Sequence, residues 1–232
     1  MKKKKKSQDH GGFGRTDVGA MKKDTSRSGR LLDKEYWLKE GEKHLLRFLP
    51  PKVDGPFYYK YYIHRIPGGE WEICLKYTFE ETCAICRMGE QLFRSKIADD
   101  VALGRQLYRK VAYICNVVDA NNASNGVQVL RFGPRLRDRL CEFFGDPDEA
   151  EDEVIDITDA ESGAYVRIRT TRSQETGNFR DHLPSIRKTG VGVPYKGWAK
   201  DLFDLEELIR GLAKSPDDLK KLLADISGAE FD

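Results

Sequence analysis

The sequence has few cysteines and few histidines, five and four among 232 residues. An odd number of cysteines argues against a secreted scaffold held by disulfides, so we expect a reducing, cytoplasmic location. The chain also lacks an apolar run near the ~20 residues of a membrane span, and no signal-peptide core follows its lysine-rich start. We therefore expect no membrane partner.

Nucleotide-binding motifs are missing as well. The sequence contains no GxxxxGK[ST] phosphate loop and no credible dinucleotide fingerprint, although it has 21 glycines. Enzymes that use these motifs are therefore not indicated. Apolar residues make up 39% of the chain, which is enough for a hydrophobic core and leaves room for polar extensions.

Charge is distributed unevenly along the chain, although the net charge is only +2. Residues 1–30 carry ten Lys and Arg against three Asp, giving +7, whereas residues 201–232 carry nine acids against four bases, giving −5. The first segment has almost no large apolar residues and is predicted to be a flexible basic arm. Such opposed ends indicate a polyanionic partner, whereas the plainer alternative is that the charges only provide solubility.

Short strands and helices alternate without a repeat between these ends. Strands are expected within 43–51, 57–67, 71–79, 108–120, 126–133 and 164–171, with a hairpin turn at 121–126. A helical pattern covers 83–109, a short helix begins at Pro134, and one or two amphipathic helices, broken at Ser215-Pro216, follow residue 201. This pattern favours a mainly β fold with some α, and a small barrel over a parallel α/β sheet.

One segment gathers the soft metal ligands. His64, Cys74, Cys83 and Cys86 supply one imidazole and three thiols, and the short spacing in CAIC lets one turn present two thiolates to the same ion. Zinc favours four such ligands in a tetrahedron, and closed sites of this composition are usually structural. We therefore predict one structural Zn²⁺ that holds a loop and does not activate water.

Three alternatives compete with this interpretation. A redox CxxC pair is expected after a strand in a βαβ unit, and no such unit is visible. A zinc deaminase needs His-x-Glu, whereas the chain has His64-Arg65-Ile66. Finally, the cysteines could be core residues; Cys115 and Cys141 stand apart from this segment in apolar surroundings.

Aromatic residues lie beside Lys and Arg in three segments, FYYKYYIHR, LYRKVAY and LRFGPRLRDR. In proteins that bind single-stranded nucleic acid, bases stack on aromatic rings while Lys and Arg contact the phosphates. Stacking needs an exposed base, so this pattern favours single strands over duplexes. The alternative is ordinary strand composition, because Tyr and Phe are common in strands and about half of them face a core.

Three segments together resemble the T-even phage helix-destabilising single-stranded DNA-binding protein family. They are KHLLRFLPPK, the ligand set within HRIPGGEWEIC and ETCAIC, and VLRFGPRLRDRL. The resemblance covers residues 31–200 and implies an OB-fold core there, a five-stranded barrel with short helices and an inserted structural zinc subdomain at 57–98. The basic arm, 1–30, and the acidic helical C-terminal region, 201–232, flank this core.

The resemblance also implies a function. It predicts a non-enzymatic protein that coats and protects single-stranded DNA in phage DNA replication, recombination and repair, in the host cytoplasm. The basic arm is expected to mediate cooperative self-association along the strand. The acidic end is expected to recruit replication and recombination proteins and to compete for the DNA groove. Zinc binding is carried over to the four residues named above. DNA contact is carried over to Arg47, Lys52, Tyr58, Lys60, Tyr62, Arg65, Trp71, Tyr108, Arg109, Lys110, Tyr113, Arg131, Phe132 and Arg135.

Two other classes of function remain open. A zinc-stabilised adaptor in a replication or transcription complex would show tight protein partners and weak DNA binding that does not depend on DNA length. A zinc hydrolase or deaminase would need an open metal position near an acid such as Glu80 or Glu81, but four protein ligands already fill the coordination shell.

Overall fold

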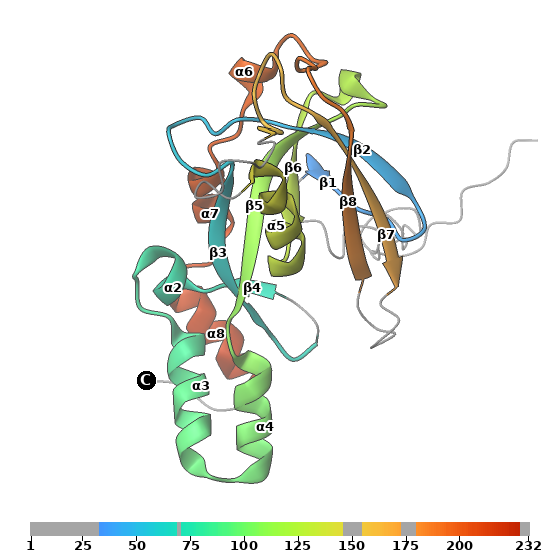
Figure 1. The fold of residues 1–232 in the computed structure, drawn as a ribbon. Helices are drawn as coiled ribbons and strands as arrows, with labels where there is room; N and C mark the ends of the chain where they lie inside the picture. Colours follow the sequence, from blue (N-terminus) through green and yellow to red (C-terminus); the bar gives the residue numbers. More distant parts are fainter. Residues whose placement is uncertain (1–32, 69–70, 146–154, 173–179, 228–232) are drawn as a thin grey trace, which may run out of the picture. The chain divides into compact units, whose positions relative to one another are not determined.

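The computed structural model describes residues 33–68, 71–145, 155–172 and 180–227 (Figure 1). The chain divides into two units, residues 1–33 and 34–232, and everything below concerns the second unit. The predicted basic arm at residues 1–30 lies outside the described residues. Within the described part of the chain, every helix is too short or too polar to cross a lipid bilayer.

Eight strands form one mixed, mostly antiparallel sheet (Figure 1). They are β1 Glu35–Tyr36, β2 Lys43–Phe48, β3 Tyr58–Arg65, β4 Trp71–Ile73, β5 Lys110–Asp119, β6 Val127–Phe132, β7 Tyr165–Arg172 and β8 Arg180–Lys188. The order is β1-β6-β5-β2-β7-β8, while β3 pairs with β5 and carries β4. Only the β1–β6 pairing is parallel among the described strands.

The long strand β5 is the centre of this sheet because it changes partner along one edge. Its first half pairs with β3 and its last three residues pair with β2, while β6 follows the opposite edge. The sheet therefore divides into two limbs around β5. Among the described strands, no pairing joins β1 to β8, so the sheet is open and the fold is mixed α/β.

Seven short helices lie between or after the strands in the described part of the chain. They are α2 Leu75–Phe79, α3 Ala84–Ser95, α4 Ala98–Leu107, α5 Pro134–Cys141, α6 Trp198–Asp201, α7 Leu205–Leu212 and α8 Pro216–Ser227, with 3-10 turns η1 Ala123–Asn125 and η2 Glu142–Phe144. The helical pattern over 83–109 is interrupted at Lys96, whose φ of 62° ends α3 and lets α4 fold back along it (Figure 1).

Most expected elements are confirmed, one expected strand is shorter, and strands β1 and β8 lie outside the expected segments. The segment 71–79 is a strand only at Trp71–Ile73, because the chain turns at Cys74, whose N–H bonds to the Tyr62 carbonyl at 2.8 Å, and continues as α2. Strand β8 contains Pro184. A proline is tolerated there because β8 lies at the edge of the sheet.

The larger core lies where α5 packs on the sheet. Leu136 and Leu140 of α5 are buried against strand side chains such as Leu46, Leu130 and Ile168. Leu136 and Leu140 are four residues apart and so share one helix face. Pro134 begins this helix and Gly145, with φ of 66°, follows η2, as the sequence predicts.

A second, smaller core contains the candidate metal ligands. It joins Cys74 and Cys83 to Ile85 and Met88 of α3 and to Leu219 and Leu223 of the C-terminal helix α8. Figure 1 shows α8 beside α2 and α3. The acidic C-terminal segment is thus folded against the segment that carries the metal ligands, at least as far as residue 224.

Candidate metal centre and nucleic-acid interface

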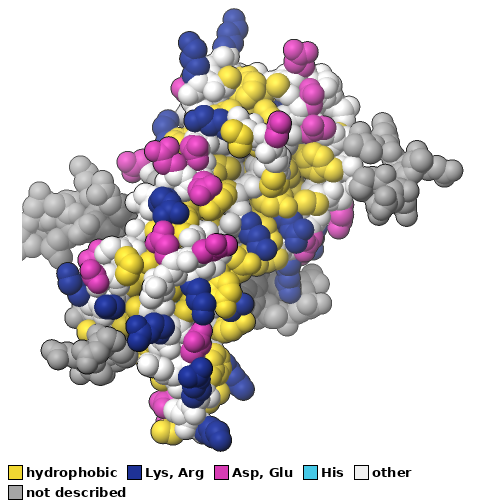
Figure 2. Space-filling view, turned by 90° about the vertical axis from the view of Figure 1, so that its left-hand side faces the viewer, with side chains coloured by type: hydrophobic (Ala, Val, Ile, Leu, Met, Phe, Trp, Pro, Cys, Tyr) yellow, Lys and Arg dark blue, Asp and Glu magenta, His cyan; other side chains and the backbone are white. Residues whose placement is uncertain are grey.

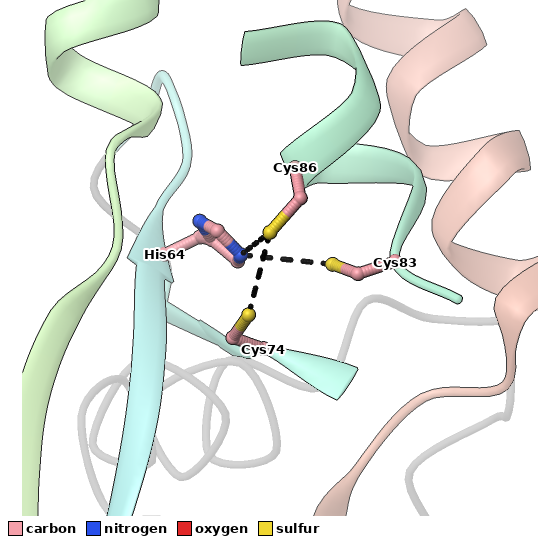
Figure 3. A group of neighbouring side chains, drawn as sticks. All are labelled: His64, Cys74, Cys83 and Cys86. Atoms are coloured by element: carbon pink, nitrogen blue, oxygen red, sulfur yellow. Dashed lines mark hydrogen bonds between the residues drawn. The ribbon is translucent and has the colours of Figure 1, made fainter. Parts of the chain in front are cut away.

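The four predicted ligands come from three neighbouring elements (Figure 3). His64 is the last residue but one of β3, Cys74 directly follows β4, and Cys83 and Cys86 stand before and in the first turn of α3. The β3–β4 hairpin brings His64 close to Cys74, because Ile63 pairs with Ile73. The turn that begins α3 then aims both CAIC sulfurs at the same point.

The ligand atoms lie at distances suited to one ion. All four fall within 4.8 Å of one another. His64 Nε2 is 3.6 Å from Cys83 Sγ and 3.5 Å from Cys86 Sγ, and Cys74 Sγ is 3.5 Å from Cys86 Sγ (Figure 3). Zn–S bonds of about 2.3 Å and Zn–N bonds of about 2.0 Å in a tetrahedron separate ligand atoms by about 3.5–3.8 Å. These three separations match such a tetrahedron, so the group could hold a metal ion.

The imidazole of His64 is oriented by a second contact. Its Nδ1 lies 2.7 Å from the Leu107 carbonyl oxygen at the end of α4. A carbonyl acceptor fixes the proton on Nδ1 and leaves the Nε2 lone pair pointing at the sulfurs, as is usual for metal-binding histidines. This contact also ties the α3–α4 hairpin to β3.

The electrostatics of the cluster favour a bound cation. Burial lowers the pKa of His64, but the neighbouring Cys74 and Cys83 sulfurs outweigh burial and raise it to about 10. Hydrogen bonds from Cys74 and Cys86 lower the pKa of Cys83. The pKa of Cys86 rises, because its hydrogen bonds with Cys74 and Cys83 favour the protonated thiol. Three thiols cannot all ionise in so small a volume unless a cation joins them.

An aromatic-basic cluster lies beside this centre and consists of Lys60, Tyr62, Tyr77, Tyr108 and Arg109. The Arg109 guanidinium lies 3.6 Å from the ring centroid of Tyr77 and 4.9 Å from that of Tyr108. The rings of Tyr62 and Tyr77 are 5.7 Å apart, and Lys60 covers Tyr62. Tyr77 and Tyr108 are 40% and 52% exposed, so both rings lie at the surface.

A small pocket connects the cluster with the metal centre. It has a volume of about 70 Å³ and is lined by His64 and Cys86 on one side and by Tyr77, Tyr108 and Arg109 on the other. Tyr77 belongs to α2, between Cys74 and Cys83. The fold of the metal segment therefore decides where this ring stands.

Two further groups of predicted contact residues lie elsewhere on the sheet. Lys110 and Arg65 lie 5.5 and 5.9 Å from the Trp71 ring centroid, on the face of β3 opposite to Tyr62. Tyr113 lies directly opposite Lys60 in the β3–β5 pairing.

Tyr113, Tyr58 and Phe132 form a third aromatic group. The Tyr113 ring stacks on Phe132 and meets Tyr58 edge-on. Both Tyr113 and Phe132 are buried, so neither ring offers an exposed face to a base, and Arg137 lies 5.4 Å from the Tyr113 ring centroid.

Arg47 has a different role from the predicted DNA contact. Its side chain is fully buried, and its guanidinium donates to the carbonyl oxygens of Phe48, Ile157, Asp159 and Val191. A Cβ at Gly163 would overlap this guanidinium. With its donors used inside the protein, Arg47 is not placed to neutralise a phosphate, and we correct its assignment to a structural one.

The remaining predicted contacts are more exposed. Lys52 lies on the loop before β3 and Arg135 in the first turn of α5, and both side chains are exposed. Arg131 of β6 is partly buried and pairs with Glu35 at 3.2 Å. The side of the molecule shown in Figure 2 mixes Lys and Arg with Asp and Glu, so this side is not uniformly cationic.

Sequence reasoning missed two residues beside the predicted contacts: Tyr77 of the aromatic-basic cluster and Arg137 next to Tyr113. Tyr77 belonged to a segment expected to be a strand, and its place beside Tyr62 depends on the turn at Cys74. Arg137 stood among exposed helix charges that usually face solvent. A signal for Tyr77 was its position between two cysteines of the ligand set, which tied its backbone to the metal site.

No model of a known protein family matches the chain, and no curated protein sequence is significantly similar to it.

Proposed function

We propose that this protein is a non-enzymatic single-stranded DNA-binding protein of the T-even phage helix-destabilising type, which coats and protects single strands during replication, recombination and repair. The observation that carries the proposal is the aromatic-basic cluster beside a His-Cys₃ group. Exposed tyrosines next to Lys60 and Arg109 would offer rings for bases to stack on and cations for phosphates.

Zinc is the metal we propose for the site. One imidazole and three thiolates in a closed tetrahedral set suit Zn²⁺, and no further position is open for water. His64, Cys74, Cys83 and Cys86 would hold the ion, which would supply folding energy and fix the position of Tyr77. The lack of an open position also argues against the hydrolase and deaminase alternatives.

An OB-fold belongs to the same proposal. The change of partner along β5 supports it, because a sheet that divides around one long strand is already partly curled. The cooperative role of the basic arm and the recruitment of replication proteins by the acidic end are further parts of the proposal. They rest on the resemblance and on the +7 and −5 charges of the two ends.

The test is a titration of the zinc-loaded protein with poly(dT) at several salt concentrations. Binding is monitored by the quenching of Tyr and Trp fluorescence. We expect strong quenching by the single strand and little by a duplex of matched length. The logarithm of the affinity should fall by about 0.7 per phosphate contact for each tenfold increase in salt.

Equal, weak binding of both DNA forms would refute the proposal. It would favour the adaptor alternative, in which a zinc-stabilised fold binds other proteins and its basic residues act only as diffuse charge. Zinc content is measured independently, by elemental analysis of the purified protein. The metal and DNA parts of the proposal can therefore fail separately.

A further inference from the structure

We infer that helices α7 and α8 clamp the metal centre, so that occupancy of the site and docking of the C-terminal helices are thermodynamically coupled. This inference rests on the metal part of the proposed function. It assigns a positioning role to residues that lie more than a hundred positions after the last ligand and do not touch the metal themselves.

Two ion pairs reach the chain just before two of the ligands. Arg210 donates to Glu81 at 2.7 Å, and Lys214 pairs with Glu72. Glu81 stands two residues before Cys83, and Glu72 stands two residues before Cys74. Each pair therefore holds the backbone that delivers one sulfur to the cluster.

The Arg210 contact extends beyond charge. Its guanidinium lies 4.1 Å from the ring centroid of Phe79, the last residue of α2. Next in the chain, Glu80 has a left-handed φ of 62° that turns the backbone toward Cys83. One side chain of α7 thus contacts both sides of the turn that joins α2 to the CAIC pair.

Helix α8 closes the same core from another side. Leu219 and Leu223, one helical turn apart, are fully or almost fully buried in the core that contains Cys74 and Cys83. They pack beside Ile85 and Met88 of α3, the helix that carries Cys86. Packing and charge therefore act on both segments that present the thiols.

Coupling of this kind works in both directions. If docked helices place the sulfurs correctly, undocking must weaken metal binding. By linkage, removal of the metal must then weaken docking by the same factor. The acidic C-terminal segment would be presented to other molecules more readily in the metal-free protein.

The first experiment measures zinc affinity by competition with a chromophoric chelator, using the full chain. The variant Arg210→Glu places like charges together at Glu81, and we expect about three- to tenfold weaker zinc binding. The double variant Glu81→Arg/Arg210→Glu should restore the affinity to within about twofold, because it re-forms the pair with reversed signs. Lys220→Glu is the matched control, since Lys220 of α8 is exposed and, among the described residues, forms its ion pair with Asp217 of its own helix.

The second experiment measures hydrogen exchange with and without zinc. Removing the metal should speed exchange of the amides around Leu219 and leave those of α5 unchanged. Wild-type protein that takes up no zinc would refute the metal assignment together with the clamp. Zinc-binding protein in which Arg210→Glu has no effect, or in which α8 stays equally protected without metal, would refute the clamp alone.

Discussion

The two hydrophobic cores of this protein are stabilised in different ways. The core between α5 and the sheet contains fifteen buried residues from strands β2, β5, β6 and β7, helix α5 and loops, and none of them is a candidate metal ligand. The core around the metal centre contains nine, of which Cys74 and Cys83 are candidate ligands. Below about 40 residues a domain usually needs a metal, a disulfide or a partner to fold.

The difference indicates a division of labour. The sheet core is built by burial of side chains alone, whereas the metal core contains the candidate ligands, includes side chains of the C-terminal helix α8 and, on the proposed function, depends on an ion. The aromatic-basic cluster spans the boundary, with Lys60 and Tyr62 on the sheet and Tyr77 on the metal segment. The affinity of a ligand bound at this cluster would therefore depend on the folding of both cores.

The largest expected effect separates the cores by removing the metal. Cys86→Ser should lose the bound ion, because a neutral hydroxyl is a poor replacement for a thiolate. The cost should be several kcal/mol, part of the about 10–16 kcal/mol that a structural Zn²⁺ supplies in small domains. Elemental analysis and the melting temperature report the loss, and hydrogen exchange should show α2, α3 and α8 opening while β5 and β6 stay protected.

Cys141→Ser provides the matched control, because this thiol lies in α5 outside the ligand group. It should keep the metal and the exchange pattern of the parent protein. Uniform opening of both cores in Cys86→Ser would show that the cores are not independent.

A second substitution should destabilise the part of the protein that contains the sheet core. Arg47→Met removes a buried guanidinium and leaves the carbonyl oxygens of Phe48, Ile157 and Val191, among others, without a donor. We expect a loss of about 3–5 kcal/mol in the free energy of unfolding, measured with denaturant. Arg187→Met, at an exposed position of β8, should change it by less than about 0.5 kcal/mol. Bound zinc per folded chain should be unchanged in both, and a loss of metal from Arg47→Met would contradict the separation.

Many strands and helices, and the candidate ligand group, could be predicted from the sequence, because the patterns that specify them are local. The prolines that end KHLLRFLPP, the proline and glycine around PRLRDRLCEFFG and the NNASNG turn predict β2, α5 and the β5–β6 hairpin without knowledge of the tertiary structure. The ligand group is predictable for the same reason: four soft ligands within one short segment have few ways to meet, and the structure does bring them together.

Long-range contacts could not be predicted in this way. Arg47 stands among apolar residues on a strand, and only the return of the chain near Ile157 and Val191 supplies its acceptors. The C-terminal helices carry an acidic charge pattern typical of a free end. Their docking depends on the apolar face with Leu219 and Leu223 and on the pairs made by Arg210 and Lys214, whose partners lie more than a hundred residues earlier.

A third prediction tests the boundary between the cores. Tyr77→Ala should weaken binding of oligo(dT) by about 1–3 kcal/mol, because one exposed stacking surface is lost while zinc stays bound. Trp37→Ala is the control, since Trp37 is similarly exposed but lies outside the aromatic-basic cluster. Fluorescence anisotropy of a labelled oligonucleotide measures both. Equal losses in the two variants would mean that binding does not depend on this cluster.

The smallest effect concerns the dependence of the sheet core on pH. Burial lowers the pKa of His182 on β8 below its usual 6.5, against the attraction of Asp181. Because the unfolded chain takes up this proton first, stability is fully present above pH 6.5 and falls as the pH drops toward the lower folded-state pKa. One proton limits the slope to about 1.4 kcal/mol per pH unit. His182→Gln should remove this component.

Acid also competes with zinc for the thiolates, but it does so in both proteins. The difference in the free energy of unfolding between wild type and variant, measured by denaturation at pH 7.5 and 5.5, therefore reports on His182 alone. Identical pH dependence in the two proteins would show that the pKa of this imidazole does not differ between the folded and unfolded states.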